Sequence, residues 1–352
     1  MKDHGQNQAK KPARTELQEL GEFGLIDRIK QKTTLQRPTS VLGIDDDAAV
    51  IDIGDHYLLV STDMLVEGVH FDLSYVPIQH LGYKAVAVNV SDIAAMNGVA
   101  EQITVNIGLS NRFSLEAVDA LYQGIERATK QYEVDLVGGD TTSSHSGLII
   151  SITALGRVAK QDLVKRSGAQ PNDLLVVSGN LGAAYLGLQV LEREKQTFLS
   201  NPEMQPKLDA YDYLIQRQLK AEARTDVVAS LKEAKILPTS MIDISDGLAS
   251  EALHLCKQSG VGVAIHEEKL PIDPLTYETA TEFSIDPTTC ALNGGEDYEL
   301  LFTVAQKDFE ILETLEGLEV IGYITNADQG AQLITKANNL IPITAQGWKH
   351  FG

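Results

Sequence analysis

The chain has 352 residues, 43% of them hydrophobic and 22% charged, a composition that excludes an intrinsically disordered or collagen-like protein. Its 49 acidic and 29 basic residues give a formal net charge of −20, so nucleic acids and anionic lipid surfaces are poor partners. At about 150 residues per domain, this length predicts two domains.

The first half of the chain alternates between strand-like and helix-like segments. A polar leader at 1–20, expected to be disordered, precedes a helical pattern at 23–30. Two strand-like runs at 48–53 and 57–61 are joined by turn residues. The next expected elements are a helix at 81–96, a strand at 102–109, a helix at 115–132, and strands at 134–137 and 148–158. Together these elements predict an N-terminal domain at 21–160.

A turn-rich segment at 159–173 is the expected domain boundary, and the C-terminal domain is expected at 161–352. Its expected elements are a strand at 174–177, a helix at 183–194, further helices to about 235, a strand at 241–244, a helix at 248–259, strands at 262–266 and 298–304, a helix at 307–315 and a strand at 319–324. Strands and helices mix in both halves, which predicts two α/β or α+β domains.

Two features indicate a cytoplasmic protein without a membrane span. The longest uncharged run, 174–191, contains glycine and asparagine, which favours a strand, a glycine turn and a buried helix over a spanning helix. Cys256 and Cys290 lie in apolar stretches and are predicted to be buried thiols, as expected in a reducing cytosol.

Acidic residues gather where apolar segments end, next to glycine, serine or threonine. The six clusters lie at 43–48, 61–63, 89–93, 138–142, 242–247 and 294–297. Short carboxylates at strand ends suit hard cations such as Mg²⁺, so the clusters predict one shared magnesium site.

Some of these residues also have a purely structural interpretation. Ser245 and Asp246 could cap the following helix, and Asp140 could form a turn or a cap. Asp92 and Asp243 are flanked by apolar residues, where an unpaired carboxylate is rarely buried, so capping explains them less well.

Other motifs leave more than one interpretation open. No P-loop, protein-kinase glycine loop, catalytic triad or zinc signature is present. The glycines of 178–182 could cradle a phosphate, and a tight strand-to-helix turn explains them equally well. His70 could be packed or could contact a substrate, and Arg166 could bind a phosphate or lie in solvent.

In their order and combination, these motifs resemble the thiamine-monophosphate kinase family. The likeness runs from about Gly21 to Phe351. The segments that resemble the family are residues 23–26, 46–48, 61–71, 82–92, 138–142, 166–168, 242–248, 295–300 and 347–351. The resemblance implies a two-domain α/β fold like that of aminoimidazole ribonucleotide synthetase. In that fold the N-terminal domains of a homodimer pair into a shared barrel, and ATP lies between domains.

The resemblance further implies a Mg²⁺-dependent kinase that transfers the γ-phosphate of ATP directly and in line to thiamine monophosphate. The products would be thiamine diphosphate and ADP, with several magnesium ions and no covalent nucleophile. The implied metal ligands are Asp47, Ser61, Thr62, Asp63, Asp92, Asp140, Asp243 and Asp246. The implied ATP contacts are Tyr122, Gly139, Asp140, Arg166 and Ser245. His70, Glu296 and Trp348 would contact thiamine monophosphate, although Trp348 could instead be a packed C-terminal anchor.

Two positions depart from the family pattern. Asp45 replaces the usual glycine, which predicts an aspartate in an unusual backbone region. Gln218 stands where histidine is common. Two alternative functions stay open at this point. One is a related ATP-dependent synthetase of the aminoimidazole ribonucleotide, selenophosphate or hydrogenase-maturation type. The other is a non-enzymatic metal-binding protein.

Overall fold

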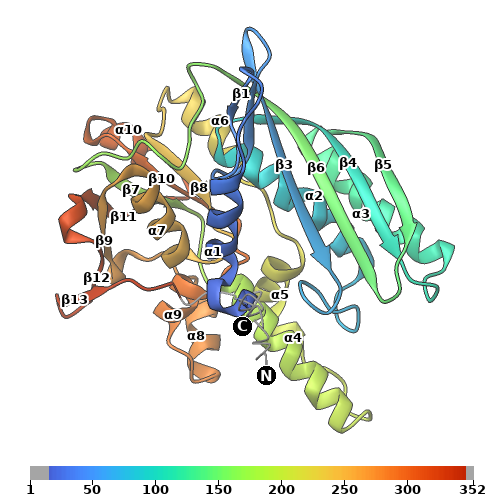
Figure 1. Cartoon of the computed structure of the whole chain (residues 1–352). Helices are drawn as coiled ribbons and strands as arrows, with labels where there is room; N and C mark the ends of the chain where they lie inside the picture. Colours follow the sequence, from blue (N-terminus) through green and yellow to red (C-terminus); the bar gives the residue numbers. More distant parts are fainter. Residues whose placement is uncertain (1–15, 346–352) are drawn as a thin grey trace, which may run out of the picture.

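The chain folds into two mixed α/β halves, each built on its own sheet (Figure 1). The structure is a computed structural model and describes residues 16–345. The first sheet has the strand order β1-β2-β3-β6-β4-β5, and the second has the order β13-β12-β9-β11-β7-β10-β8. The predicted two-domain α/β architecture is confirmed.

The first half consists of a six-stranded sheet with two long helices against it. Its elements are α1 (Leu17–Lys32), β1 (Ser40–Leu42), β2 (Ala49–Asp52), β3 (His56–Val66), α2 (Ile78–Ala95), β4 (Val99–Leu109), α3 (Leu115–Tyr132), β5 (Asp135–Ser143) and β6 (Leu148–Ala159). Neighbouring strands are antiparallel except β4 and β5, which are parallel.

Helix α2 is the central element of the molecule. It packs against α3, β3 and β6 of the first half and against β8, α5 and α6 of the second. This surrounds the helix with protein and explains why it is apolar on nearly every face. The crossing with α3 is close, because a Cβ at Gly124 would lie 1.9 Å from the Gln79 carbonyl oxygen. A larger residue there would push the two helices apart.

The second half has a seven-stranded sheet with helices around it. Its strands are β7 (Leu174–Ser178), β8 (Ser240–Asp243), β9 (Gly262–His266), β10 (Leu300–Val304), β11 (Leu318–Thr325), β12 (Ala331–Ile334) and β13 (Leu340–Pro342). Its α-helices are α4 (Ala183–Ser200), α5 (Asp212–Leu219), α6 (Thr225–Glu233), α7 (Leu248–Ser259), α8 (Pro274–Glu282), α9 (Pro287–Asn293) and α10 (Phe309–Leu312). In Figure 1, α1 runs along the front between the two halves.

Most expected elements are present, with differences at their ends. Helices α3 and α7 and strand β9 have the predicted bounds. The helix expected at 307–315 is wrong in extent, because a 3₁₀ turn and the four-residue α10 occupy that segment. The sequence prediction missed β1, β12, β13, α8 and α9. Helix α1 begins at Leu17, inside the expected leader at 1–20, and residues 1–15 lie outside the described part of the chain.

The uncharged run at 174–191 forms β7, a glycine turn and the start of α4, as predicted. Within residues 16–345, none of the helices has both the length and the apolar character that crossing a bilayer requires. Both cysteines are free and buried, also as predicted. Burial raises the pKa of Cys256 to about 11 and that of Cys290 to about 12.

Candidate functional site

Three carboxylates from distant parts of the sequence meet between the two halves. Asp47 precedes β2, Asp92 lies on α2, and Asp243 ends β8. Each offers one oxygen atom, and these oxygen atoms all lie within 4.8 Å of one another. Asp47 and Asp243 are buried, and Asp92 is partly buried. We call these three residues the carboxylate cluster. Hard oxygen donors at this separation suit a divalent cation.

Strand β3 places further oxygen atoms that could bind a metal ion beside the cluster. The Ser61 hydroxyl donates to the Asp92 carboxylate. The Asp63 backbone N–H donates to Asn89 Oδ1 at 3.0 Å, which ties the strand to α2. Ser61 is buried and Asp63 partly buried, whereas the intervening Thr62 is exposed, as the alternation of a strand requires.

The crowding of negative charge makes ionisation of these groups unfavourable. Burial, with Glu296 nearby, raises the pKa of Asp63 to about 6. Burial, with Asp47 nearby, raises the pKa of Asp243 to about 7. The pKa of Asp92 is raised well above its usual range by burial and by Asp63. A bound cation would remove this penalty.

Arg166 is the cation placed at one side of the carboxylate cluster. Its guanidinium donates to Asp47 Oδ1 at 2.6 Å, and its backbone N–H donates to Asp46 Oδ1 at 3.2 Å. Arg166 therefore does not lie free in solvent. The other Asp47 oxygen, Oδ2, is buried and has no hydrogen-bond partner among the described residues. An orphaned buried carboxylate oxygen is a position where a metal ion fits.

Asp45 lies in the turn that leads to Asp47 and has φ of 128°. The prediction of an aspartate in an unusual backbone region is confirmed. Its side chain pairs with Lys30, and its carbonyl oxygen accepts from Gln258 Nε2 at 3.1 Å. These two contacts hold the turn in place.

The segment from Ser245 to Asp246 is shaped by a buried glutamate. The backbone N–H groups of Ser245 and Asp246 donate to Glu251 Oε1 at 3.2 and 2.8 Å. The N-cap of α7 is Gly247, without a side-chain capping bond, so the capping interpretation of Ser245 and Asp246 is wrong. Burial and the nearby Asp246 raise the pKa of Glu251 to about 8.

Glu296 lies on a strained loop between α9 and β10, and its backbone N–H donates to the carbonyl oxygen of Ser245, two residues after Asp243, at 2.7 Å. Glu296 has φ of 63° and Tyr298 has φ of 50°, a region that non-glycine residues seldom adopt. The Glu296 carboxylate pairs with Lys84 of α2 and accepts from the Tyr298 hydroxyl at 3.3 Å. Backbone strain of this kind persists only where the surroundings enforce it, and it is concentrated at functional sites.

Several site residues implied by the family resemblance lie away from the cluster. Gly139 and Asp140 lie on β5, at the edge of the first sheet, so the turn or cap interpretation of Asp140 is wrong. The Thr62 hydroxyl donates to the Ile152 carbonyl oxygen at 3.1 Å, away from Asp92. His70 Nδ1 accepts from the Val66 backbone N–H at 3.0 Å. Trp348 lies outside the described residues.

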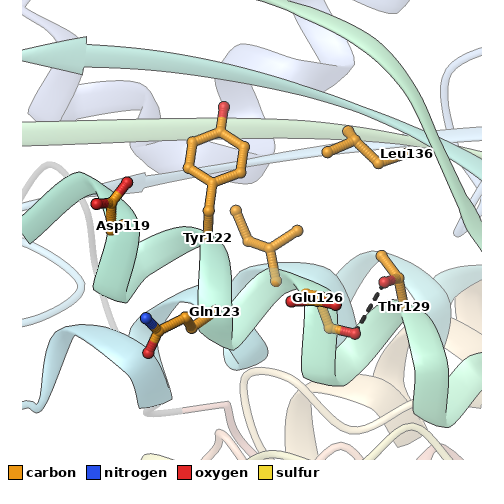
Figure 2. Close-up of a pocket in the computed structure, with 7 residues that line it drawn as sticks. Asp119, Tyr122, Gln123, Glu126, Thr129 and Leu136 are labelled. Atoms are coloured by element: carbon orange, nitrogen blue, oxygen red, sulfur yellow. Dashed lines mark hydrogen bonds between the residues drawn. The ribbon is translucent and has the colours of Figure 1, made fainter. Parts of the chain in front are cut away.

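Tyr122 lines a groove of about 460 Å³ between α3 and β5. Figure 2 shows its ring rising from α3 between Asp119 and Leu136, with Glu126 further along the helix. The groove is thus separate from the carboxylate cluster within one chain.

The glycine turn at 178–182 does not form a free phosphate cradle. The Gly182 backbone N–H donates to Asp297 Oδ2 at 2.9 Å. A Cβ at Gly179 would lie 2.2 Å from Glu299 Oε1. The protein's own carboxylates occupy this turn, so the alternative interpretation, a tight strand-to-helix turn, is confirmed.

The sequence analysis missed Lys84 and Glu251 as members of the site. Lys84 had a detectable signal, because it is a charged residue in an apolar helix and lies eight positions before Asp92, on the same helical face. Glu251 had none, since a glutamate in the first turn of a helix is ordinary.

The AIR synthase related protein family matches the chain in two parts, its N-terminal domain over residues 45–158 and its C-terminal domain over residues 170–333. The chain is 36% identical to the thiamine-monophosphate kinase of Aquifex aeolicus (strain VF5), covering 95% of this chain and 99% of that protein. It is 33% identical to the thiamine-monophosphate kinase of Bacillus subtilis (strain 168), covering 94% and 100%.

Solved structures show the same likeness. One, described as "AaThiL complexed with AMPPCP and TMP", matches with a TM-score of 0.80 at 34% identity, covering 96% of this chain and 99% of that one. The hydrogenase maturation protein HypE in complex with ATP matches with a TM-score of 0.68 at 18% identity, covering 96% and 99%. The second match shows a shared fold only.

Proposed function

Because the chain belongs to the thiamine-monophosphate kinase family, we propose that it transfers the γ-phosphate of ATP to thiamine monophosphate, giving thiamine diphosphate and ADP. The observation that most directly supports this function is the carboxylate cluster beside Arg166. The cluster is assembled between the halves from residues of the family motifs. Hydrogenase maturation proteins share the fold at 18% identity, which supports no shared reaction.

The donor set fits magnesium ions. All of its ligand atoms are oxygens, and Asp47 Oδ2 is buried without a partner in the described structure. The ions would be held by Asp47, Ser61, Asp63, Asp92 and Asp243. Asp246 and, from the edges of the first sheet, Thr62 and Asp140 would add further ligands. When bound, magnesium would neutralise the phosphates and so let two anionic substrates approach an acidic protein.

The remaining site residues would bind and orient the two substrates. Arg166 would donate to an ATP phosphate, because its planar guanidinium suits such an oxygen and is already held at the cluster. Ser245, Gly139 and Tyr122 would contribute further ATP contacts. His70, Glu296 and Trp348 would contact thiamine monophosphate, where an acidic side chain suits the positive charge of its thiazolium ring.

We propose direct, in-line transfer without a phosphoenzyme. A covalent route needs a nucleophile beside its base. The aspartates here accept from Arg166 or from serine hydroxyls, with no base beside them in the described part of the chain, and the acceptor phosphate oxygen is already ionised at pH 7. Positioning and charge neutralisation would then supply most of the rate.

Incubation with γ-labelled ATP tests both the substrate and the route. With thiamine monophosphate and Mg²⁺, label should move into thiamine diphosphate. With thiamine as acceptor, or with EDTA, transfer should be lost. Without an acceptor, no label should remain on the protein after denaturation. Failure to label thiamine diphosphate would refute the kinase assignment, and a labelled protein competent to pass on its phosphate would refute direct transfer.

We further propose a homodimer in which two first sheets close into a shared barrel. Strand β3 pairs with β2 only over residues 57–60, so residues 61–66 have an open edge in the described structure. Strand β5 lies at the other edge of the sheet, and all of its residues are exposed. Exposed edges are normally covered or paired. A second copy could place its β5 along this open part of β3.

Such pairing would also explain the position of Asp140. Along one row of the sheet, Asp63 pairs with Ile152, Ile152 with Val105, and Val105 with Gly139. Gly139 is therefore three strands from Asp63, roughly 14 Å at the usual strand spacing. Asp140 of the same chain is too distant to share a metal ion with Asp63, whereas Asp140 of a second copy would lie beside it.

Mixing two inactive variants tests this arrangement. Asp63→Asn and Asp140→Asn should each be inactive, and subunit exchange between them should restore about one quarter of wild-type activity, because half the dimers carry one intact site. Asp63→Asn mixed with Asp92→Asn is the matched control and should stay inactive. A monomeric mass, or no recovery in mixed dimers, would contradict the shared site.

We also propose the assignment of the domains and the location of the protein. The first sheet lies within residues 40–159 and the second within 174–342, which supports domains at 21–160 and 161–352. The first would bind ATP and Mg²⁺ and form the dimer. Two buried free thiols and a net charge of −20 support action in the cytoplasm without a nucleic acid or membrane partner.

A further inference from the structure

Lys84 is a buried charge on the helix that carries Asp92. It lies in the middle of α2 and is only 7% exposed. A lysine ammonium this deeply buried must be paired to keep its charge. Its Nζ donates to the Gln218 carbonyl oxygen at 3.0 Å and to the Glu296 carboxylate. Gln218 lies on α5 and Glu296 in the loop before β10, so both partners of Lys84 come from the second half.

The Lys84–Glu296 pair joins the two halves of the molecule. Lys84 belongs to the first half, and Glu296 lies 212 residues later, in the loop before β10. The same loop is tied to the strand that ends in Asp243, because the Tyr298 backbone N–H donates to the Ile244 carbonyl oxygen at 2.8 Å. The pair therefore sets how the Glu296 loop lies relative to α2.

Without Lys84, the position of Glu296 would be electrostatically unfavourable. The Glu296 backbone N–H donates to the Ser245 carbonyl oxygen at 2.7 Å, which places Glu296 against the acidic segment that contains Asp243 and Asp246. Glu296 also adopts a left-handed backbone conformation that a non-glycine residue avoids. The Tyr298 hydroxyl provides only a long, neutral hydrogen bond at 3.3 Å. The ammonium of Lys84 is the cation that offsets the repulsion.

We propose that Lys84 is a positioning residue for the kinase reaction. It holds the Glu296 carboxylate across the boundary between the halves, in the loop that contacts the segment after Asp243, so that Glu296 can bind thiamine monophosphate. This inference rests on the proposed function, in which Glu296 contacts that substrate. Lys84 itself is too buried to serve as a primary phosphate contact.

Substitution of Lys84 should act selectively on one substrate. Lys84→Met keeps the length of the side chain and removes its charge. We expect it to raise KM for thiamine monophosphate roughly tenfold or more, the usual effect of losing a hydrogen bond to a charged group. KM for ATP should change less than threefold. Lys84→Arg keeps the charge and should recover part of the loss.

A double-mutant cycle separates positioning from an independent role. If Lys84 acts through Glu296, then Lys84→Met/Glu296→Gln should be no worse than Glu296→Gln alone. Multiplicative losses, or an equal rise of both KM values, would overturn the proposal. Lys84→Gln, which keeps a donor without the charge, replaces Lys84→Met in the cycle if the methionine variant does not fold.

Lys195→Met is the matched control. Lys195 also pairs across the halves, with Asp72 at 2.7 Å, but it lies on α4 away from the cluster. It should leave both KM values unchanged, and a substrate-selective effect in Lys195→Met would overturn the proposal.

Calorimetric binding of thiamine monophosphate to each variant gives a readout that does not depend on turnover. If wild-type protein binds thiamine monophosphate but transfers no phosphate, the proposed function fails while the Lys84 proposal is still decided by these affinities.

Discussion

Replacing Asp92 by asparagine should lower kcat about 10³-fold while leaving the fold intact. Asp92 is the one member of the cluster on α2, and it also accepts from the Ser61 hydroxyl. The amide keeps the shape of the side chain but removes the charge that would bind a cation, a loss of several kcal/mol in stabilisation of the transition state. The fall in kcat is measured by steady-state turnover with thiamine monophosphate at saturating Mg²⁺.

The same variant should be more stable than the wild type in EDTA. Burial raises the pKa of Asp63 to about 6 and that of Asp243 to about 7. Between about pH 4 and pH 7 the folded protein therefore retains protons that the unfolded chain has released, so the free energy of unfolding falls as pH rises. Asp92→Asn removes one repelling carboxylate, and its melting temperature should fall less between pH 5 and pH 8.

Asp173→Asn provides the control for this result. Asp173 is buried as well, but it accepts from the Thr239 hydroxyl at 2.7 Å in the second half, away from the cluster. Its loss should lower stability and spare kcat. Wild-type turnover with normal magnesium dependence in Asp92→Asn would refute the metal-binding role of the cluster.

Replacing Arg166 by alanine should weaken ATP binding by about 10- to 100-fold, through loss of charged hydrogen bonds to phosphate. It should also destabilise the ligand-free protein by about 3–5 kcal/mol, because the Asp47 side chain is fully buried and would lose its partner. Adding Mg²⁺ should recover most of the stability, since a cation replaces the guanidinium beside Asp47. Nucleotide titrations and denaturant unfolding, with and without Mg²⁺, measure the two effects.

Two further variants make the Arg166 result specific. Arg166→Ala/Asp47→Asn removes both charges and should regain stability without regaining ATP affinity. Arg193→Ala removes an arginine that pairs with Glu282 at 2.7 Å near α8, and it should not alter ATP affinity. Unchanged affinity in Arg166→Ala would show that this arginine serves the fold alone.

Local sequence patterns were sufficient for most of the longer elements and for the chemistry of the acidic segments. The bounds of α3, α7 and β9 follow from apolar periodicity with clear helix and strand ends. Strand β5 was predicted too short, because its second part, Gly138 to Ser143, is polar and exposed at the sheet edge. Pairing with β4 extends the strand through these residues, and local strand propensity does not predict that pairing. The unusual conformation of Asp45 was predicted from the family pattern, in which glycine is usual at this position.

What the sequence by itself determined is the set of acidic segments, because each follows an apolar run and its residue types already select for oxygen-seeking cations. Only the tertiary structure decided which of these carboxylates meet. Asp47, Asp92 and Asp243 converge because α2 is buried between the halves, and that packing is a long-range property. The pairing of Lys84 with Glu296 across 212 residues has the same origin. A side chain's partner is set by the fold as a whole, whereas its chemistry is set by its type.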